Sequence, residues 1–376
     1  MMSRSAASSV GSIAGEPPQK NMLEPASSSS PSLSLALLHD EIAVSCFARV
    51  PRCYYPVISL VCKNFRRLIA SPEIYIERSV IHRTEHILYV AIRSEATKTR
   101  SWYTLNLKPY GTTEISHRLV PVPSFPPIPS SGTTIISAGS EIYVVGGCID
   151  GELVSTVSVI DCRSHTCRFL PNMKEPRKCA AVGLIEGKLY VVGGCNAPSL
   201  NWVEVFNFKK QTWESVLSLD NVDLEEQMNC FVMNDKVYRM GQKTSFVYDP
   251  KKGIFEEALT SKKFWMNGSC PIDNMLYGFY RNNGLVAYDS VVGCWTVFWG
   301  FQGLPEKFEG CTSTMVNHGG RLAILFKKSP TEIWCTEIAM ERAEEEGFIG
   351  GKFLWSNHVL TLTDSFIIER ALNVTV

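Results

Sequence analysis

Two nearly identical stretches, IYVVGGC at residues 142–148 and LYVVGGC at residues 189–195, constrain the fold of this chain more than any other feature. Each is an apolar run without polar alternation, and each closes with a pair of glycines before a cysteine. A strand that is apolar at consecutive positions needs both of its faces covered. Paired glycines let the backbone bend, or approach a neighbour, where a Cβ would clash. The duplication therefore predicts small sheets that are sandwiched between copies of themselves.

A second pattern occurs in four copies and sets the length of the repeat. An apolar pair precedes an acidic or amide residue, and a cysteine or aromatic residue follows six positions later. The acidic or amide residues, spaced by 46, 42 and 40 positions, are Asp161, Asn207, Asp249 and Asp289, and the later residues are Cys167, Trp213, Phe255 and Trp295. Asp and Asn side chains bond the backbone of tight turns. We expect strands joined by such turns, with the aromatic residue packed between neighbouring sheets.

The repeats are numerous enough to close a ring. Strand-like runs bearing a tyrosine precede the four copies, at Tyr143, Tyr190, Tyr238 and Tyr277. The four repeats cover about residues 133–180, 181–226, 229–266 and 268–310, and one weaker unit on each side makes six. A ring of such sheets has no long free edges, which is the arrangement of a β-propeller. Because the first unit lacks a strand, we expect residues 368–376 to pair with it and close the ring.

The region before the repeats has the periodicity of helices. A first helix is expected to begin near Asp40 and to end before Pro51. A second helix is expected to run without interruption from Pro56 to Ser71, and Pro72 then begins a third. The second helix carries an apolar stripe formed by Ile58, Val61, Cys62, Phe65, Leu68 and Ile69. This stripe must be covered either by the rest of the chain or by another protein.

The repeats resemble the kelch repeat. The resemblance rests on Gly146-Gly147 and Gly193-Gly194, each followed by an apolar run and by the six-residue spacing. The second copy ends in the expected tryptophan, Trp213, whereas the first has Cys167 in its place. The resemblance implies a six-bladed kelch β-propeller over residues 85–376.

The helical region resembles an F-box over residues 38–79, most closely in LVCKNFRRLIASP at 60–72. His39 stands where that family usually has proline. An F-box followed by a kelch ring is the layout of a large plant family. The resemblance implies a mainly β fold with a small α module, namely a three-helix F-box over residues 35–82 ahead of the propeller.

The resemblance to this family implies an adaptor rather than a catalyst. The F-box would dock on the Skp-type subunit of an SCF ubiquitin ligase, and through it on a cullin. The propeller would hold the protein to be ubiquitinated. The residues expected to bind the Skp-type subunit are Leu38, Ile42, Phe47, Ile58, Val61, Phe65 and Leu68, some of which we also expect in the core of the module. The residues expected to be structural in the repeats are Gly146, Gly147, Gly193, Gly194, Trp213 and Trp295.

The protein substrate is not identified by the sequence. Propeller faces are built from several loops, and loop composition names no partner. Loop positions that are candidates for substrate contact are Arg177, Trp265 and Arg281.

Composition excludes several other classes of protein. Lys plus Arg and Asp plus Glu both number 37, so the chain offers no overall basic field for nucleic acid. No apolar run reaches the roughly 18 residues of a membrane span. The seven histidines are scattered without ligand spacing, so we expect no metal site, no cofactor and no copper-dependent oxidase activity. A propeller scaffold that binds a partner without ubiquitin transfer remains the alternative, and binding to a Skp-type subunit distinguishes the two.

The N-terminus suggests where the protein works. Residues 1–34 are rich in Ser and nearly free of large apolar side chains, so we expect a disordered leader rather than a secretory signal. The cytosol or the nucleus is then the expected compartment, and the 13 cysteines are expected to be thiols. A Ser-rich, acid-poor leader also leaves plastid import open.

Overall fold

The computed structural model describes residues 38–108, 116–122, 125, 128–129, 131–195, 199–219, 228–241, 245–257, 268–280, 284–297, 313–342 and 349–376. The leader expected at residues 1–34 lies outside these ranges. Helices form first along the described chain: α1 (Asp40–Ala48), the 3₁₀ turn η2 (Arg52–Tyr54), α2 (Tyr55–Ile58), α3 (Lys63–Ile69) and α4 (Pro72–Val80). We refer to residues 40–80 as the helical module.

The prediction of one continuous helix from Pro56 to Ser71 is wrong. The helix α2 ends at Ile58, and Cys62 is extended, with φ −159° and ψ 167°. The Cys62 sulfur accepts a hydrogen bond from the backbone N–H of Phe65 at 3.4 Å, so it caps the first turn of α3. A side chain that satisfies an otherwise unpaired N–H lets a new helix begin here.

Six four-stranded antiparallel sheets follow, which we number as blades 1 to 6. Blade 1 is β26 (Phe366–Thr375), β1 (His86–Ser94), β2 (Arg100–Lys108) and β3 (Ser116–Pro121). Blade 2 is β4 (Thr134–Ala138), β5 (Glu141–Val145), β8 (Val157–Asp161) and β9 (Thr166–Phe169), with the hairpin β6 (Cys148–Ile149) and β7 (Glu152–Leu153) between β5 and β8. Blade 3 is β10 (Ala181–Ile185), β11 (Lys188–Val192), β12 (Ser199–Asn207) and β13 (Thr212–Leu219).

The remaining three blades repeat the same strand order. Blade 4 is β14 (Met228–Met233), β15 (Lys236–Gly241), β16 (Ser245–Asp249) and β17 (Ile254–Glu257). Blade 5 is β18 (Cys270–Ile272), β19 (Met275–Tyr280), β20 (Gly284–Asp289) and β21 (Cys294–Val297). Blade 6 is β22 (Ser313–His318), β23 (Arg321–Lys327), β24 (Glu332–Arg342) and β25 (Ile349–Thr361).

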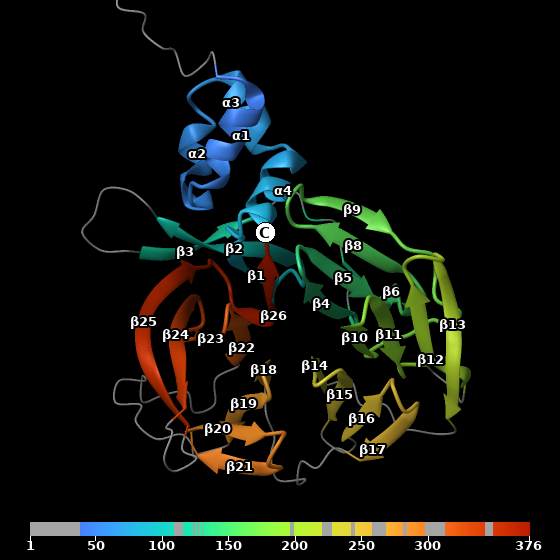
Figure 1. Cartoon of the computed structure of the whole chain (residues 1–376). Coiled ribbons are helices and arrows are strands. Elements are labelled where there is room, and N and C mark those ends of the chain that lie inside the picture. Colours follow the sequence, from blue (N-terminus) through green and yellow to red (C-terminus); the bar gives the residue numbers. More distant parts are fainter. Residues whose placement is uncertain are drawn as a thin grey trace, which may run out of the picture. The chain divides into compact units, whose positions relative to one another are not determined.

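The six blades form a closed β-propeller (Figure 1). The first strand of each blade contacts the first strand of the next, in the order β26, β4, β10, β14, β18, β22 and back to β26. Closure depends on β26, which pairs antiparallel with β1 from His86 opposite Thr375 to Ser94 opposite Phe366. The prediction that the end of the chain supplies the missing strand of the first blade is therefore confirmed.

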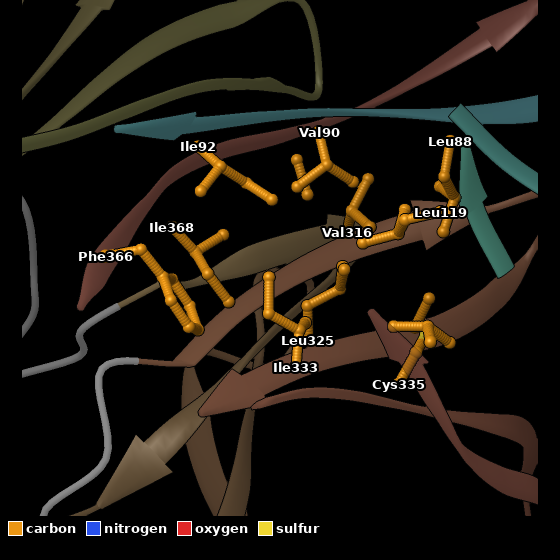
Figure 2. Close-up of a cluster of buried hydrophobic side chains, with 13 residues drawn as sticks. Leu88, Val90, Ile92, Leu119, Val316, Leu325, Ile333, Cys335, Phe366 and Ile368 are labelled. Atoms are coloured by element: carbon orange, nitrogen blue, oxygen red, sulfur yellow. The ribbon is translucent and has the colours of Figure 1, made fainter. Parts of the chain in front are cut away.

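The joint between the first and last blades is a continuous apolar core (Figure 2). Leu88, Val90 and Ile92 of β1 pack with residues of blade 6. The labelled partners from blade 6 and from β26 are Val316, Leu325, Ile333, Cys335, Phe366 and Ile368. Side chains from segments that are far apart in the sequence thus fill one space on one face of β1. Tyr89 lies between Leu88 and Val90 and bonds His165 of blade 2, so both faces of β1 are covered and consecutive apolar residues occur along it.

The constant six-residue offset has a local cause. In each of the four copies, the acidic or amide side chain accepts hydrogen bonds from backbone N–H groups of the following turn, as Asp249 does from Lys251 at 3.0 Å and Lys252 at 3.2 Å. The residue before it pairs across the turn with the later position: Ile160 with Cys167, Phe206 with Trp213, Tyr248 with Phe255 and Tyr288 with Trp295. The predicted Asp- and Asn-centred turns are confirmed.

The glycine pairs occupy positions where a side chain does not fit. Gly194 has φ +87°, and a Cβ on it would lie 2.6 Å from the carbonyl oxygen of Lys178. Gly146, Gly147 and Gly193 also have positive φ and close neighbours. Each pair therefore supplies both a left-handed backbone and a close approach between chain segments.

We expect Gly194→Ala to destabilise the propeller by about 2–4 kcal/mol, because a strained φ and a backbone clash act together. Gly187→Ala is the matched control: Gly187 has φ +69°, but nothing lies within 4 Å of the added Cβ. The control should lose only about 1 kcal/mol. The midpoints of urea unfolding curves measure both changes, and equal losses would contradict the role given to the close approach.

Candidate functional site

The helical module has a core of its own. The rings of Phe47 in α1 and Phe65 in α3 meet edge to face, with centroids 4.8 Å apart. Leu68 of α3 and Ile74 of α4 are also buried. Tyr55 donates its hydroxyl hydrogen to the carbonyl oxygen of Phe47 at 3.1 Å, and burial raises the pKa of Tyr55, which keeps the hydroxyl neutral. Phe47, Phe65 and Leu68 therefore hold the module together, although they were predicted to bind the Skp-type subunit.

Other apolar side chains of the module are exposed. The exposed fraction of the residue is 53% for Ile42, 42% for Val57, 75% for Leu60 and 66% for Val61. We call these four the docking residues. Ile42 lies on α1, and the other three lie on α2 and the turn that follows it. Large apolar side chains left in water by a complete core mark a surface that another protein can cover.

Only part of this surface was predicted from the sequence. Ile42 and Val61 belonged to the predicted set, whereas Leu38 and Ile58 are half-buried. Val57 and Leu60 were missed, because the predicted continuous helix put them off the apolar stripe. The signal that could have found Leu60 is its place in the apolar stretch LV that precedes Cys62.

Asp40 fixes the start of α1 against α3. Its Oδ1 accepts a hydrogen bond from the Asn64 side-chain amide at 3.0 Å, and its other oxygen pairs with Arg67. Asp40 therefore connects α1 with α3, the helices before and after the segment that carries Val57, Leu60 and Val61. His39, beside Asp40, is exposed.

Arg177 lies inside the propeller between blades 2 and 3. Its side chain is fully buried and pairs with the fully buried carboxylate of Glu204 at 2.8 Å. The guanidinium donates to the carbonyl oxygen of Gly193 at 2.6 Å, and the carbonyl oxygen of Arg177 accepts from the Gly147 N–H at 2.7 Å. Arg177 thus connects the two glycine pairs. With no exposed surface, it is not available to a substrate on the face of the ring.

The repeat aromatics pack between blades. Trp213 is buried in a cluster that joins blades 2 and 3, and its indole N–H donates to the carbonyl oxygen of Pro171 at 2.7 Å. Trp295 packs with Tyr288 against residues of blade 4, with ring centroids 5.2 Å apart. These positions fit the structural role expected for both tryptophans.

The joint between blades 1 and 2 is built differently, because Cys167 replaces the tryptophan there and is exposed. Phe125, from the segment between the two blades, packs against Trp102 with centroids 4.9 Å apart and against His165 at 5.7 Å. Tyr89 also bonds His165 Nε2 at 2.9 Å. Burial lowers the pKa of His165, so this joint holds a neutral imidazole. Phe125 was not predicted, because it belongs to no repeated pattern in the sequence.

Two candidate contact residues, Trp265 and Arg281, lie outside the described residues. Within the described ranges, no three His, Cys, Asp or Glu side chains are grouped so that they could hold a metal ion. In the same ranges, every helix is too short or too polar to cross a membrane.

Comparison with protein families matches both parts of the chain. The F-box domain family matches residues 35–77. The FKB95 kelch-repeats domain family matches residues 102–360. The first match covers all but the last three residues of the helical module, and the second covers most of the six blades.

Relatives from the plant Arabidopsis thaliana match almost the whole length. The chain is 83% identical to F-box/kelch-repeat protein At4g14905 over 375 residues, which is 100% of each chain. It is 54% identical to F-box/kelch-repeat protein At4g39240, covering 92% of this chain and 93% of the relative. It is 40% identical to F-box/kelch-repeat protein At4g38940, covering 88% of this chain and 92% of the relative. With both domains matched and full-length relatives at this identity, the chain belongs to the F-box/kelch-repeat protein family.

Proposed function

We propose that this chain is the substrate-recognition adaptor of an SCF-type ubiquitin ligase. F-box domains generally bind Skp-type subunits, and the F-box match coincides with the helical module. The observation that carries the proposal is that the module completes its own core and still exposes Ile42, Val57, Leu60 and Val61. Covering one such side chain contributes about 1.5–3 kcal/mol, so a few anchors suffice for a specific complex.

The proposed mechanism needs no catalytic group on this chain. The Skp-type subunit covers the docking residues and connects the chain to a cullin, while the propeller holds a protein substrate. The ligase then brings an activated ubiquitin close to that substrate. The rate gain comes from effective concentration, because two bound partners meet in one assembly. Geometry, rather than acid–base chemistry, is this chain's contribution.

The proposed place of action is the cytosol or the nucleus. All twelve described cysteines are free thiols, including buried Cys162, Cys270 and Cys335. Burial raises the pKa of the Cys162 thiol to about 12, so it remains protonated and unreactive. Free, buried thiols are typical of proteins from reducing compartments.

The double variant Leu60→Asp, Val61→Asp tests the docking surface. Both side chains are largely exposed, so the substitutions should leave the fold unchanged. In the complex, two carboxylates would have to lose their hydration without a partner. We expect the affinity for a purified Skp-type subunit to fall at least about 30-fold, measured by titration calorimetry.

Val291→Asp serves as the matched control for this experiment. Val291 is 73% exposed, but it lies in a turn of blade 5 far along the chain from the module. Its affinity for the Skp-type subunit should equal that of the unaltered chain. If the double variant also binds normally, the docking residues are misassigned. If the unaltered chain does not bind at all, the propeller acts as a scaffold without ubiquitin transfer.

A further inference from the structure

Only five residues, Ile81–Glu85, separate α4 from β1, and their conformation is specified by hydrogen bonds. The N–H of Arg83 donates to the carbonyl oxygen of Arg78 at 2.8 Å. The N–H of His82 donates to the carbonyl oxygen of Ser79 at 3.3 Å. His82 has φ +53°. This is the Schellman arrangement, which ends a helix with a left-handed residue. The segment therefore leaves α4 in a defined direction.

The other end of the segment is already part of the propeller. The N–H of Glu85 donates to the carbonyl oxygen of Val376 at 2.6 Å, and the N–H of Val376 donates to that of Glu85 at 2.9 Å. These two bonds extend the β26–β1 ladder one step beyond the pair His86 and Thr375. Val376, at the end of this ladder, is buried. The backbone of Glu85 belongs to the ring.

The side chain of Glu85 turns back to the helical module. Its Oε1 pairs with the guanidinium of Arg78, on α4, and accepts a hydrogen bond from the N–H of Arg52, on η2, at 3.0 Å. The side chain of Arg78 is only 2% exposed. The η2 turn also contacts β2 of blade 1. The carboxylate of Glu85 thus contacts two elements of the module, α4 and η2, while the backbone of Glu85 is hydrogen-bonded to Val376.

Arg78 makes this contact costly to break. Its other terminal nitrogen donates to the carbonyl oxygens of Ala48 at 3.2 Å and Val50 at 2.9 Å, and to the Tyr55 hydroxyl at 3.0 Å. The guanidinium is therefore held in place by α1 and α2 whether or not Glu85 is present. If the propeller turned away from the module, the buried guanidinium of Arg78 would lose the carboxylate of Glu85 with which it pairs.

We propose that Glu85 is a positioning residue that locks the helical module to the propeller at one fixed orientation. This inference rests on the proposed function for its purpose, because a fixed orientation keeps a bound substrate at a constant distance from the ligase and raises effective concentration. The lock itself is a property of this chain alone. It is therefore measurable without a substrate or any other ligase subunit.

Glu85→Ala in the full chain tests the lock. Hydrogen exchange at the backbone N–H of Arg52, measured by NMR, should accelerate at least about tenfold, since that N–H loses a charge-assisted hydrogen bond. Small-angle X-ray scattering should show a broader distance distribution and a larger radius of gyration, because the module gains freedom. The melting temperature of the propeller should change little, since the side chain of Glu85 is 35% exposed and lies outside the blade cores. Unchanged exchange together with unchanged scattering would overturn the proposal.

Two further variants make the result specific. Glu73→Ala removes an exposed glutamate from α4, the helix that carries Arg78, and should leave exchange at Arg52 and the scattering profile as in the unaltered chain. Glu85→Gln keeps an oxygen acceptor but removes the charge, so its exchange rate should lie between those of the unaltered chain and Glu85→Ala. If Glu85→Ala and Glu85→Gln both exchange at Arg52 at the rate of the Glu73→Ala control and give the same scattering profile as that control, the proposal is overturned.

Binding to the Skp-type subunit separates this inference from the proposed function. The docking residues Leu60 and Val61 are untouched by Glu85→Ala, so the affinity for that subunit should stay within about twofold of the unaltered chain. Loss of binding in the unaltered chain would reject the adaptor function and leave the exchange and scattering results valid. Normal binding, with unchanged exchange at Arg52 and unchanged scattering in Glu85→Ala, would reject only the lock.

Discussion

Deleting Phe366–Val376 should lower the melting temperature of the propeller by at least about 12 °C or abolish folding. The segment supplies the innermost strand of blade 1 and contacts β4 and β22 on either side. Four of its large apolar residues, Phe366, Ile368, Val374 and Val376, are at most 6% exposed. Burying each contributes about 1.5–3 kcal/mol, or roughly 6–12 kcal/mol together. That sum is comparable with the entire stability of an ordinary domain, and about 2 °C or more is lost per kcal/mol.

Thermal unfolding followed by circular dichroism measures the effect of the deletion. Thr363→Ala, an exposed substitution just before β26, is the control and should melt within about 1 °C of the unaltered chain. Adding a synthetic peptide of residues 362–376 should restore part of the lost stability, because the β1 edge would again be paired. A truncated chain that melts like the full chain would show that the ring does not depend on β26.

The features that were predicted well from the sequence either lie within one blade or follow from the number of strands in a repeat. The six-residue offset follows from one turn and one cross-strand pair, so it survives in each copy even where the glycine pair is lost, as around Asp289 and Trp295. Ring closure by the last strand followed from counting strands in the first unit. Both inferences needed only short stretches of sequence, because the forces involved act within one blade.

The features that were missed depend on contacts between distant segments. Glu204 stands 27 positions after Arg177, and nothing near either residue signals that they form a buried pair. Phe125 fills the space at the joint of blades 1 and 2, where Cys167 is too small and too exposed to do so. In both cases tertiary packing, rather than local pattern, determines the role of the residue.

The interruption between α2 and α3 has a different origin. The apolar spacing from Ile58 to Leu68 satisfies a helix, so periodicity alone predicts one continuous element. The structure instead uses the Cys62 sulfur to cap α3, a role that capping preferences seldom assign to cysteine. The consequence for function is direct, because the interruption is what puts Leu60 and Val61 at the surface.

Arg177→Met should destabilise the propeller by about 3–5 kcal/mol, the usual cost of removing one partner from a buried ion pair. Glu204 would remain fully buried as a carboxylate without its cation. It would still accept the N–H groups of Lys174 at 2.7 Å and Glu175 at 3.1 Å, which fix the loop between blades 2 and 3. The carbonyl oxygen of Gly193 would lose its donor as well. Since blades 2 and 3 meet here, the loss should appear as a lower urea midpoint for the whole propeller.

The exposed pair Lys210 and Glu214 provides the control for this measurement. Its side chains are 66% and 54% exposed, so Lys210→Met should change stability by less than about 0.5 kcal/mol. The double variant Arg177→Met, Glu204→Leu removes the uncompensated charge and should recover at least about 1 kcal/mol relative to Arg177→Met alone. Full recovery is not expected, because the N–H groups of Lys174 and Glu175 would then lack an acceptor. If Arg177→Met is no less stable than Lys210→Met, Arg177 does not join the two blades.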